Sequence, residues 1–414
     1  MFVADNNLYQ ARRRAKHRPV ANVGSVTEQG RTVESVRRAN LGSILGTVHR
    51  EGPLSRAALT EATGLNRSTI ADLVGTLVSF GLVAERAPDP SHRVGRPSPV
   101  VCVDPSVVAI AVNPEVDALE IAAVGLDRGI RAVVVLPQDQ LLSPAATAAL
   151  IAAQIDAWRT EELADARILG IGLAVPGLVR TEDGVVRDAP HLGWIDEPLR
   201  DVVADATGLP VVVGNDATLG TVAEHLFGAA RGIRHAVYLN GGASGIGGGI
   251  IVNGMPVVGA GGYAGEFGQN RPGIATLADR RARDGVLEDE VSRARLLSVV
   301  GLARGDDREL GDALAAGLDT PSVAGEVERQ RRILATALSN AVNVLNPSAI
   351  VLGGFLAVLA GLDTAALEAA VRAQAMPACG EDLRILPAEL AEHRLLIGAA
   401  EAVFDGVLVN PQPV

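Results

Sequence analysis

Two acidic side chains in the second half of the chain occupy positions that suit chemistry. Asp216 follows an apolar run over 211–213 and begins a helical pattern that continues to Phe227. Glu266 lies alone among the glycines of the stretch 259–269. Proteins of the α/β class place chemistry where a strand ends and a helix begins, and a carboxylate buried among glycines needs hydrogen-bond donors. Both acids are therefore candidate functional residues, with a helix cap or a satisfied buried group as the structural alternative.

A run of glycines at 241–249 lies between the apolar segments Ala236–Asn240 and Ile250–Val252, which we predict to be strands. Glycine-rich loops let backbone N–H groups come close to a phosphate or a sugar. Hairpins between buried strands also use glycine, so the run by itself leaves both interpretations open.

These residues belong to a long segment, 105–414, in which strand and helix patterns alternate. Strands are predicted at Val107–Val112, Leu119–Val124, Ile130–Leu136, Ile168–Leu173 and Val211–Val213, and helices at Ala145–Trp158 and Thr218–Phe227. Such alternation is typical of an α/β domain. The chain has 414 residues, of which 48% are hydrophobic, so it can form a large core and is expected to contain two or three domains.

Three helical patterns precede this segment. Leu41, Ile44, Leu45 and Val48 lie on one face of a helix over 33–50, Ser55 caps a short helix that ends at Gly64, and Asn66 caps a third. The apolar face of the third helix is formed by Ile70, Leu73, Val74 and Leu77. The short link between the last two helices indicates a helix-turn-helix, whose second helix enters the major groove of DNA by its first turn. We therefore predict that Asn66, Arg67, Ser68 and Thr69 contact DNA.

The next segment has the pattern of a wing. Two short strands, 82–85 and 100–103, flank a stretch shaped by Gly and Pro that carries Arg93 and Arg96. These arginines are predicted to contact the phosphates or the minor groove. Residues 31–104 thus form a winged helix-turn-helix, with a three-helix packing module that does not bind DNA as the alternative.

The charge distribution agrees with DNA binding by this part alone. Residues 1–100 contain 14 Lys and Arg against 8 Asp and Glu, a balance of +6, whereas residues 101–414 contain 23 against 40, a balance of −17. An acidic body repels a polyanion, so the basic N-terminal part is the expected nucleic-acid module. Residues 1–30 lack periodicity and are predicted to be a flexible basic arm.

Composition excludes several other classes of protein. Cys102 and Cys379 are the two cysteines, so a disulfide framework and a cysteine-rich zinc site are excluded and a cytoplasmic location is expected. The first 30 residues lack an apolar signal segment. The uncharged stretches Ala236–Gly265 and Ser339–Leu362 are interrupted by Gly, Asn or Pro, so we expect no membrane span.

Seven segments, in this order and spacing, resemble the ROK family of repressors, open reading frames and sugar kinases. They are Gly170–Gly177, Ala189–Trp194, Gly214–Ala217, Gly241–Gly249, Ala264–Gly268, Gly285–Glu288 and Asn346–Gly354. The resemblance runs from about Val33 to Ala402. It implies an actin-like, two-lobed sugar-kinase fold over 105–414 that binds a sugar and dimerises. In this family a winged helix-turn-helix precedes that fold only in the regulators.

The resemblance also implies roles for individual residues. In family kinases the Asp that matches Asp216 is the general base for a sugar hydroxyl, and Asn215 matches its neighbour. The family acids that match Glu266 and Glu288 bond sugar hydroxyls, and Gln269 stands where a family His touches the sugar. His191 replaces a common family Asn. Carboxylates and amides that each pair with a hydroxyl would reject a ligand that lacks one.

The sequence departs from the family where ATP would bind. Family kinases have a glycine-rich loop that cradles phosphate at the position of Val112–Asp117 in this chain. Here the glycines are absent, Pro114 has no N–H, and Glu115 and Asp117 would repel phosphate. Phosphoryl transfer depends on positioning and charge neutralisation, so we expect no catalytic activity, with Asp216 as the remnant of a general base.

The second departure concerns zinc. The family zinc ligands, one His and three Cys, are replaced by Gln269, Asp279, Arg281 and Val286, and a structural zinc site needs four good ligands. We therefore expect no metal and no other cofactor. The loop after Gln269 is expected to be held instead by Asp279 or Asp284 with Arg280, Arg281 or Arg283.

Together these observations predict a cytoplasmic, sugar-responsive transcription regulator. It would act as a repressor of carbohydrate uptake or catabolism genes, bind an operator as a dimer, and respond to a sugar or sugar phosphate. Two alternatives remain: an ATP-dependent sugar kinase that carries a DNA-binding module, and a regulator that has lost its response to ligand.

Overall fold

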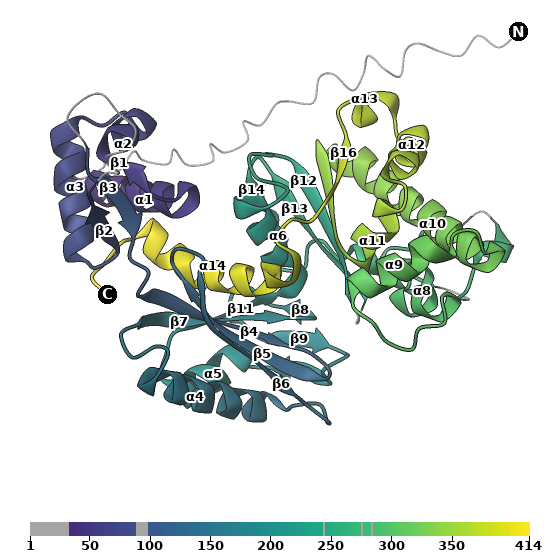
Figure 1. The fold of residues 1–414 in the computed structure, drawn as a ribbon, viewed down its shortest axis with the longest axis horizontal. Coiled ribbons are helices and arrows are strands. Elements are labelled where there is room, and N and C mark those ends of the chain that lie inside the picture. Colours follow the sequence, from purple (N-terminus) through teal and green to yellow (C-terminus); the bar gives the residue numbers. More distant parts are fainter. Residues whose placement is uncertain (1–32, 88–97, 243–244, 275, 283–284) are drawn as a thin grey trace, which may run out of the picture.

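The computed structural model describes residues 33–87, 98–242, 245–274, 276–282 and 285–414, arranged as a small N-terminal unit beside two larger lobes (Figure 1). The predicted arm at 1–30 and the wing arginines Arg93 and Arg96 lie outside the described residues. No helix within the described ranges combines the length and the hydropathy required to span a bilayer.

The N-terminal unit has the helices and the wing strands that the sequence predicts. Helices α1 (Val33–Glu51), α2 (Arg56–Thr63) and α3 (Arg67–Ser79) pack beside a sheet in the order β1 (Leu54–Ser55), β3 (Val100–Val103) and β2 (Val83–Arg86). Ser55 accepts a hydrogen bond from Ala58 N, Gly64 ends α2 in the left-handed conformation, and Asn66 accepts from Thr69 N. Local capping therefore sets the boundaries of α2 and α3.

The first lobe is built on a five-stranded sheet in the order β11-β7-β4-β5-β6. Its strands are β4 (Val107–Pro114), β5 (Ala118–Gly125), β6 (Ile130–Pro137), β7 (Arg167–Val175) and β11 (Val211–Asn215). Helices α4 (Pro144–Thr160) and α5 (Leu199–Thr207) cover one face, and the C-terminal helix α14 (Arg394–Val409) covers the other (Figure 1). A small sheet of β8 (Leu178–Val179), β9 (Val186–Ala189) and β10 (Trp194–Glu197) adjoins it.

The second lobe repeats this arrangement of strands. Its sheet has the order β14-β13-β12-β15-β16. Counted from β16, three parallel strands are followed by two antiparallel ones, as in the first lobe counted from β11. The strands are β12 (Ala236–Gly241), β13 (Ile246–Val252), β14 (Met255–Pro256), β15 (Ala349–Gly354) and β16 (Arg384–Pro387). Two lobes with matching sheets confirm the expected actin-like α/β fold.

Helices cover the second sheet on both faces. Helix α6 (Asp216–Phe227) lies against β13 on one face. The remaining elements, mostly packed around the other face, are η2 (Phe267–Gln269), η3 (Leu277–Asp279), α7 (Leu287–Glu290), α8 (Arg293–Val299), α9 (Asp307–Gly317), α10 (Pro321–Leu345), α11 (Phe355–Gly361), α12 (Thr364–Gln374), α13 (Pro377–Gly380) and η4 (Ala391–His393).

The glycine run is in large part a strand rather than a loop. Residues from Ile246 onward form β13 and pair with β12, so the turn is shorter than the predicted 241–249. A Cβ built on Gly247 would lie 2.6 Å from the Cβ of Ala217, and one built on Gly249 would lie 2.1 Å from Thr221 Oγ1. The close approach of α6 to the sheet therefore explains these glycines. This agrees with the alternative interpretation of the run as part of a hairpin between buried strands.

The N-terminal unit shares its core with the first lobe. Leu41, Ile44 and Val48 of α1 belong to one hydrophobic cluster with Leu396 and Phe404 of α14. A Cβ on Gly42 would lie 2.7 Å from the carbonyl oxygen of Leu408, so the two helices approach very closely. The two folds on either side of the predicted boundary at residue 104 therefore share one continuous hydrophobic core.

Candidate functional site

The structure brings the five candidate ligand-binding residues together. Asn215, Asp216, Glu266, Gln269 and Glu288 line one cavity of about 410 Å³ between the two lobes. Strand β11 positions the first two at its carboxyl end, and the segment after β14 supplies Glu266 and Gln269. The cavity has the size and the mixture of polar groups expected of a small-molecule site.

Asn215 and Asp216 are fixed by the start of α6. The side-chain oxygen of Asn215 accepts a hydrogen bond from Thr218 N at 2.9 Å, so Asn215 is the helix cap. Its amide nitrogen donates to Gly177 O at 3.0 Å and to Asp216 Oδ1 at 3.1 Å. Asp216 Oδ1 also accepts from Ala217 N at 2.8 Å. These bonds orient the Asp216 carboxylate and leave Oδ2 without a protein partner among the described residues.

Two carboxylates of the site have raised pKa values. Burial, together with the nearby charges of Glu115 and Glu266, raises the pKa of Asp216 to about 7, although Ala217 N–H and Arg394 act in the opposite direction. Burial also raises the pKa of Glu266, with a contribution from Glu288. A group with a pKa near neutrality can accept a proton from a hydroxyl or donate one to it.

Glu288 and Gln269 form a second anchored pair. Gln269 Nε2 donates to Glu288 Oε1 at 2.6 Å, and Ile246 N donates to Glu288 Oε2 at 3.1 Å. The pair therefore links the segment after β14 to the start of β13 and to α7. Gln269 is exposed and retains an amide oxygen that can accept a hydrogen bond from a ligand.

Several residues of the site were not identified from the sequence. Asp188 and Asn240 line the cavity, and Asn240 is 7% exposed with an amide oxygen that has no partner among the residues that the structure describes. Arg394, at the start of α14, influences the pKa of Asp216 although 178 residues separate them. Only pairing of distant strands and helices brings these groups together, so no local pattern could have revealed them. His191, which the resemblance singled out, also lines the cavity.

The segment Val112–Asp117 stands where family kinases have a phosphate-binding glycine loop. In this structure it contains a tight turn between β4 and β5. Glu115 N donates to Ala118 O at 2.8 Å, and Asn113 Nδ2 donates to Glu115 Oε1 at 3.2 Å. Burial, together with the neighbouring Asp117, raises the pKa of Glu115. Asn113 is buried, and its amide oxygen has no partner within the described part of the chain. A carboxylate therefore occupies the turn where family kinases place phosphate-binding glycines.

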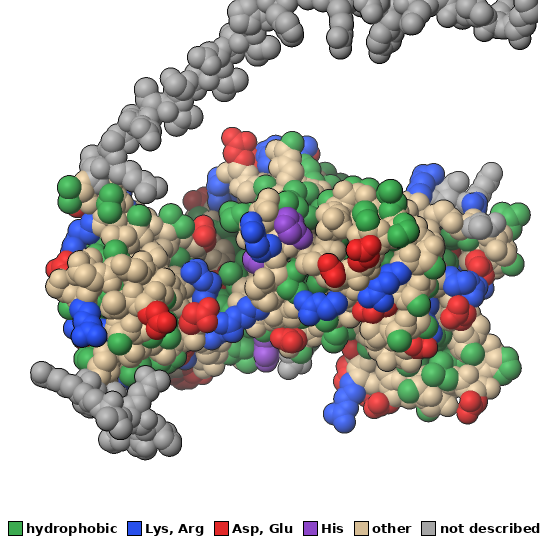
Figure 2. Space-filling view, turned by 90° about the horizontal axis from the view of Figure 1, so that it is seen from above, with side chains coloured by type: hydrophobic (Ala, Val, Ile, Leu, Met, Phe, Trp, Pro, Cys, Tyr) green, Lys and Arg blue, Asp and Glu red, His purple; other side chains and the backbone are tan. Residues whose placement is uncertain are grey.

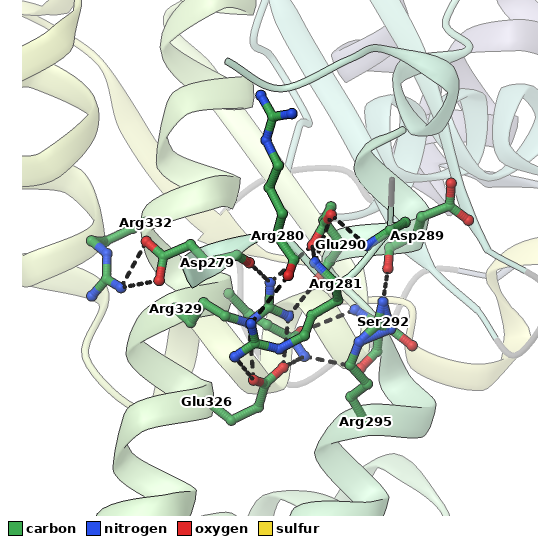
Figure 3. A network of polar contacts seen from close by, with 12 residues as sticks. Asp279, Arg280, Arg281, Asp289, Glu290, Ser292, Arg295, Glu326, Arg329 and Arg332 are labelled. Atoms are coloured by element: carbon green, nitrogen blue, oxygen red, sulfur yellow. Dashed lines mark hydrogen bonds and ion pairs between the residues drawn. The ribbon is translucent and has the colours of Figure 1, made fainter. Parts of the chain in front are cut away.

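An arginine network holds the segment where the family zinc site would lie (Figure 3). Arg329 of α10 is 2% exposed and pairs with Glu290 at 3.1 Å and with Glu326 at 2.7 Å. Glu290 also accepts hydrogen bonds from Arg281 N at 3.0 Å. The expected partners of Asp279 were wrong: it pairs with Arg332 of α10 at 3.1 Å, because the segment packs on that helix rather than on itself. Arg283 and Asp284 lie outside the described residues.

The replacement of the zinc ligands agrees with this packing. Within the part of the chain that the structure describes, no three His, Cys, Asp or Glu side chains are grouped as a metal site needs. Arg281 and Arg329 instead place positive charge where thiolates would hold a cation. The donor set present therefore does not fit zinc.

The predicted DNA-reading residues lie on the outer surface of α3. Asn66, Arg67 and Ser68 are exposed and Thr69 is partly exposed. Asn66 caps the helix, and the Ser68 hydroxyl donates to Asn66 Oδ1 at 2.7 Å. Arg67 has no ion-pair partner among the side chains that are described.

Helix α1 engages the outer face of α3 beyond its first turn. Arg37 donates to Asp72 at 2.6 Å and to Thr76 at 2.7 Å. The helical pattern places these two residues on the same outer face. Their side chains are therefore already bonded to Arg37 of α1. On the body, Figure 2 shows basic and acidic side chains interspersed over one face, so the described residues there form no single basic patch. The first turn of α3 is accessible for contacts with DNA and makes no bond to α1 among the residues that are described, whereas Asp72, although exposed, is already paired with Arg37.

Comparison with known proteins places the fold and the site in a family. The model of the ROK family matches residues 110–405. The xylose repressor of Bacillus spizizenii is 25% identical over 390 residues, which cover 90% of this chain and 97% of the relative. The N-acetylglucosamine repressor of Escherichia coli O157:H7 is 26% identical over 399 residues, which cover 91% and 96%.

A solved structure shows the same fold over nearly the whole chain. It is described as a ROK family transcriptional regulator, a homologue of the E. coli Mlc protein, and has 23% sequence identity. It superposes with a TM-score of 0.72 and covers 90% of this chain and 98% of its own. The match therefore includes the N-terminal unit as well as the two lobes.

Proposed function

Since the chain belongs to the ROK family, we propose that it is a sugar-responsive transcriptional repressor that binds an operator through α3 and senses a sugar between its two lobes. One observation carries the proposal. A cavity lined by the five matched polar residues and an exposed, capped α3 occur in the same chain, joined by one core. The xylose and N-acetylglucosamine repressors, which align over nearly their full length, support the same assignment.

The sugar is proposed to bind through its hydroxyl groups. Asp216 and Glu266 accept hydrogen bonds from hydroxyls, Asn240 offers an unpartnered amide oxygen, and Gln269 offers a further acceptor. A ligand that lacks one of these hydroxyls leaves a buried polar group unpaired, which gives selectivity among sugars. The described residues that line the cavity include no Arg or Lys, which favours a neutral sugar over a sugar phosphate.

DNA recognition is proposed to be symmetric. A dimer presents two copies of α3 to half-sites that are related by a two-fold axis, and Arg93 and Arg96 add contacts from the wing. A repressor of this kind works in the cytoplasm, where its operator lies. Sugar and operator then affect each other's affinity by the same factor.

The kinase alternative is disfavoured by the turn after β4. Glu115, with its carboxylate close to Asp216, replaces a neutral glycine loop that must accommodate a charged phosphate. We propose that Asp216 positions a sugar hydroxyl by accepting its hydrogen bond and does not remove the proton for attack on a phosphoryl group. An ATP-dependent assay with D-glucose, D-xylose and N-acetyl-D-glucosamine is expected to show no turnover. Turnover that disappears in Asp216→Asn would instead establish a kinase.

Calorimetry and gel-shift titration test the regulator directly. One of the three sugars is expected to bind the wild-type protein and to weaken its binding to a duplex selected from a random DNA library. Asp216→Asn and Glu266→Gln are expected to lose sugar binding but to keep DNA binding. A wild-type protein that binds DNA but none of these or related sugars is the third possibility, a regulator without ligand response.

A further inference from the structure

A histidine of the N-terminal unit is inserted into the body of the protein. His49, near the end of α1, is 2% exposed, and its Nε2 lies 3.0 Å from Glu401 Oε2 on α14, which is 5% exposed. The other ring nitrogen, Nδ1, lies 2.7 Å from the carbonyl oxygen of Leu126, just after β5. Both polar atoms of the ring are therefore satisfied by the first lobe.

Two aromatic rings complete the surroundings of this histidine. The ring of Phe227, the last residue of α6, lies 5.6 Å from the ring of His49, and the ring of Phe404 on α14 lies 6.0 Å away. The guanidinium of Arg128 lies over the ring of Phe227, 4.6 Å from its centroid. His49 thus contacts α6, α14 and the turn after β5 at a single point.

One of the two helices that hold His49 reaches the ligand cavity, and the other begins with a charge that acts on it. Helix α6 begins at Asp216, which lines the cavity, and ends at Phe227. Helix α14 begins at Arg394, whose charge acts on Asp216 and Glu115. Glu401 follows Arg394 by seven residues, which is about two turns and therefore the same side of the helix.

Close backbone contact makes these helices move as one unit. A Cβ on Gly398 of α14 would lie 2.3 Å from the carbonyl oxygen of Leu219 on α6. A Cβ on Gly172 of β7 would lie 1.9 Å from the carbonyl oxygen of Ala399. A displacement at the cavity end of either helix therefore cannot be absorbed by loose packing between them.

We propose that His49 and Glu401 are positioning residues that fix α1, and with it the recognition helix α3, to α6 and α14, so that a change at the cavity reaches the DNA-reading surface through this buried pair. The inference rests on the proposed function, because it supplies the route by which sugar binding would act on DNA binding. Helix α3 follows this movement because Arg37 of α1 is bonded to Asp72 and Thr76.

The structure also provides a matched control. Arg231, just beyond α6, pairs with Glu51 at 2.6 Å, and both side chains are about half exposed. This pair joins the same two units and involves the same helix α1, two residues after His49. Because exposed ion pairs constrain geometry weakly, its loss should leave the coupling between the two sites unchanged.

The experiment measures the coupling factor, the ratio of the operator dissociation constants with and without sugar. The probes are the selected duplex and whichever of D-glucose, D-xylose and N-acetyl-D-glucosamine binds the wild-type protein. Glu401→Gln and His49→Gln keep the size and polarity of the side chains and are expected to reduce a coupling factor of roughly 5–150, the usual range, to below about 2. Each variant should still bind the sugar and the duplex separately, and Glu51→Gln should retain the wild-type factor.

Hydrogen exchange gives a second readout that does not need the sugar. In Glu401→Gln the amides of α1 from Leu41 to Val48 are expected to exchange faster, whereas in Glu51→Gln they should exchange as in the wild type. Wild-type coupling in both buried-site variants would overturn the inference and leave the proposed function intact. Absence of coupling in the wild-type protein would overturn both.

Discussion

The guanidinium of Arg329 lies 3.1 Å from the carboxylate of Glu290, and the two side chains are 2% and 1% exposed. Arg329 also donates to the Glu290 carbonyl and to the carboxylate of Glu326, next to the segment where the family resemblance implied a zinc site. In a buried charge network of this kind, the loss of one partner leaves an uncompensated charge in the interior, which is strongly destabilising.

Removal of the central arginine should therefore be costly. Arg329→Met leaves the Glu290 carboxylate buried without its cation, and we expect the free energy of unfolding to fall by about 3–5 kcal/mol. The matched variant Arg332→Ala breaks an exposed pair with Asp279 and should cost at most about 1 kcal/mol. Urea denaturation followed by circular dichroism measures both, and equal losses would contradict a special role for the buried pair.

Metal removal is expected to have no effect on stability. Gln269, Asp279, Arg281 and Val286 occupy the positions of the family ligands and cannot form a tetrahedral zinc site. The melting temperature should therefore be the same before and after dialysis against a chelator, and elemental analysis of the purified protein should find no stoichiometric zinc. A melting temperature that falls on chelation and recovers with zinc would refute this prediction.

The raised pKa of Asp216 predicts a pH dependence of stability. Burial raises the pKa of Asp216 from 3.8 to about 7, so between these values the folded protein holds a proton that the unfolded chain has released. Its contribution to stability is thus complete at low pH and declines as the pH rises through about 7. Asn at this position does not titrate, so wild type should lose stability relative to Asp216→Asn between about pH 5 and pH 8. A difference that is constant over this range would exclude the assigned shift.

The exposed first turn of α3 predicts two classes of DNA-binding variant. Arg67→Ala and Ser68→Ala should relax the preference for the selected operator over unrelated DNA, by roughly 1–3 kcal/mol for each lost base contact. Arg93→Ala and Arg96→Ala should weaken binding to all sequences and reduce the slope of affinity against salt concentration. Gel-shift titrations at two salt concentrations distinguish the classes, with Arg332→Ala as a control on the body. Unchanged binding in all four variants would remove the assignment of this surface.

Local chemistry made much of the N-terminal unit and part of the site predictable. Ser55, Gly64 and Asn66 cap helices through bonds to residues two to four positions away, so their roles are written in the nearby sequence. Asn215 likewise caps α6 next to Asp216. The helix pattern is less reliable at Ala62: its spacing from Ala58 and Leu59 predicts an inward side chain, yet Ala62 is exposed, because α2 is short and only Leu59 of its residues is fully buried.

Long-range packing decided the rest, because the relevant partners are far apart in the chain. From the sequence the glycine run could be interpreted as a loop, whereas in the structure α6 packs against it. Asp279 was expected to pair with arginines near it in the chain, but its partner is Arg332 of α10. His49 and Glu401 are separated by 352 positions, and nothing in either local segment indicates that they meet.

The sequence by itself determined the order of the helices and strands, the charge difference between the two parts of the chain, and the polar residues offered to a ligand. Only the tertiary structure decided which of these groups share a cavity, which side chains hold the segment after Gln269, and how the N-terminal unit is joined to the body. The physical reason is that capping and amphipathic patterns depend on neighbours along the chain, whereas burial and charge pairing depend on neighbours in space.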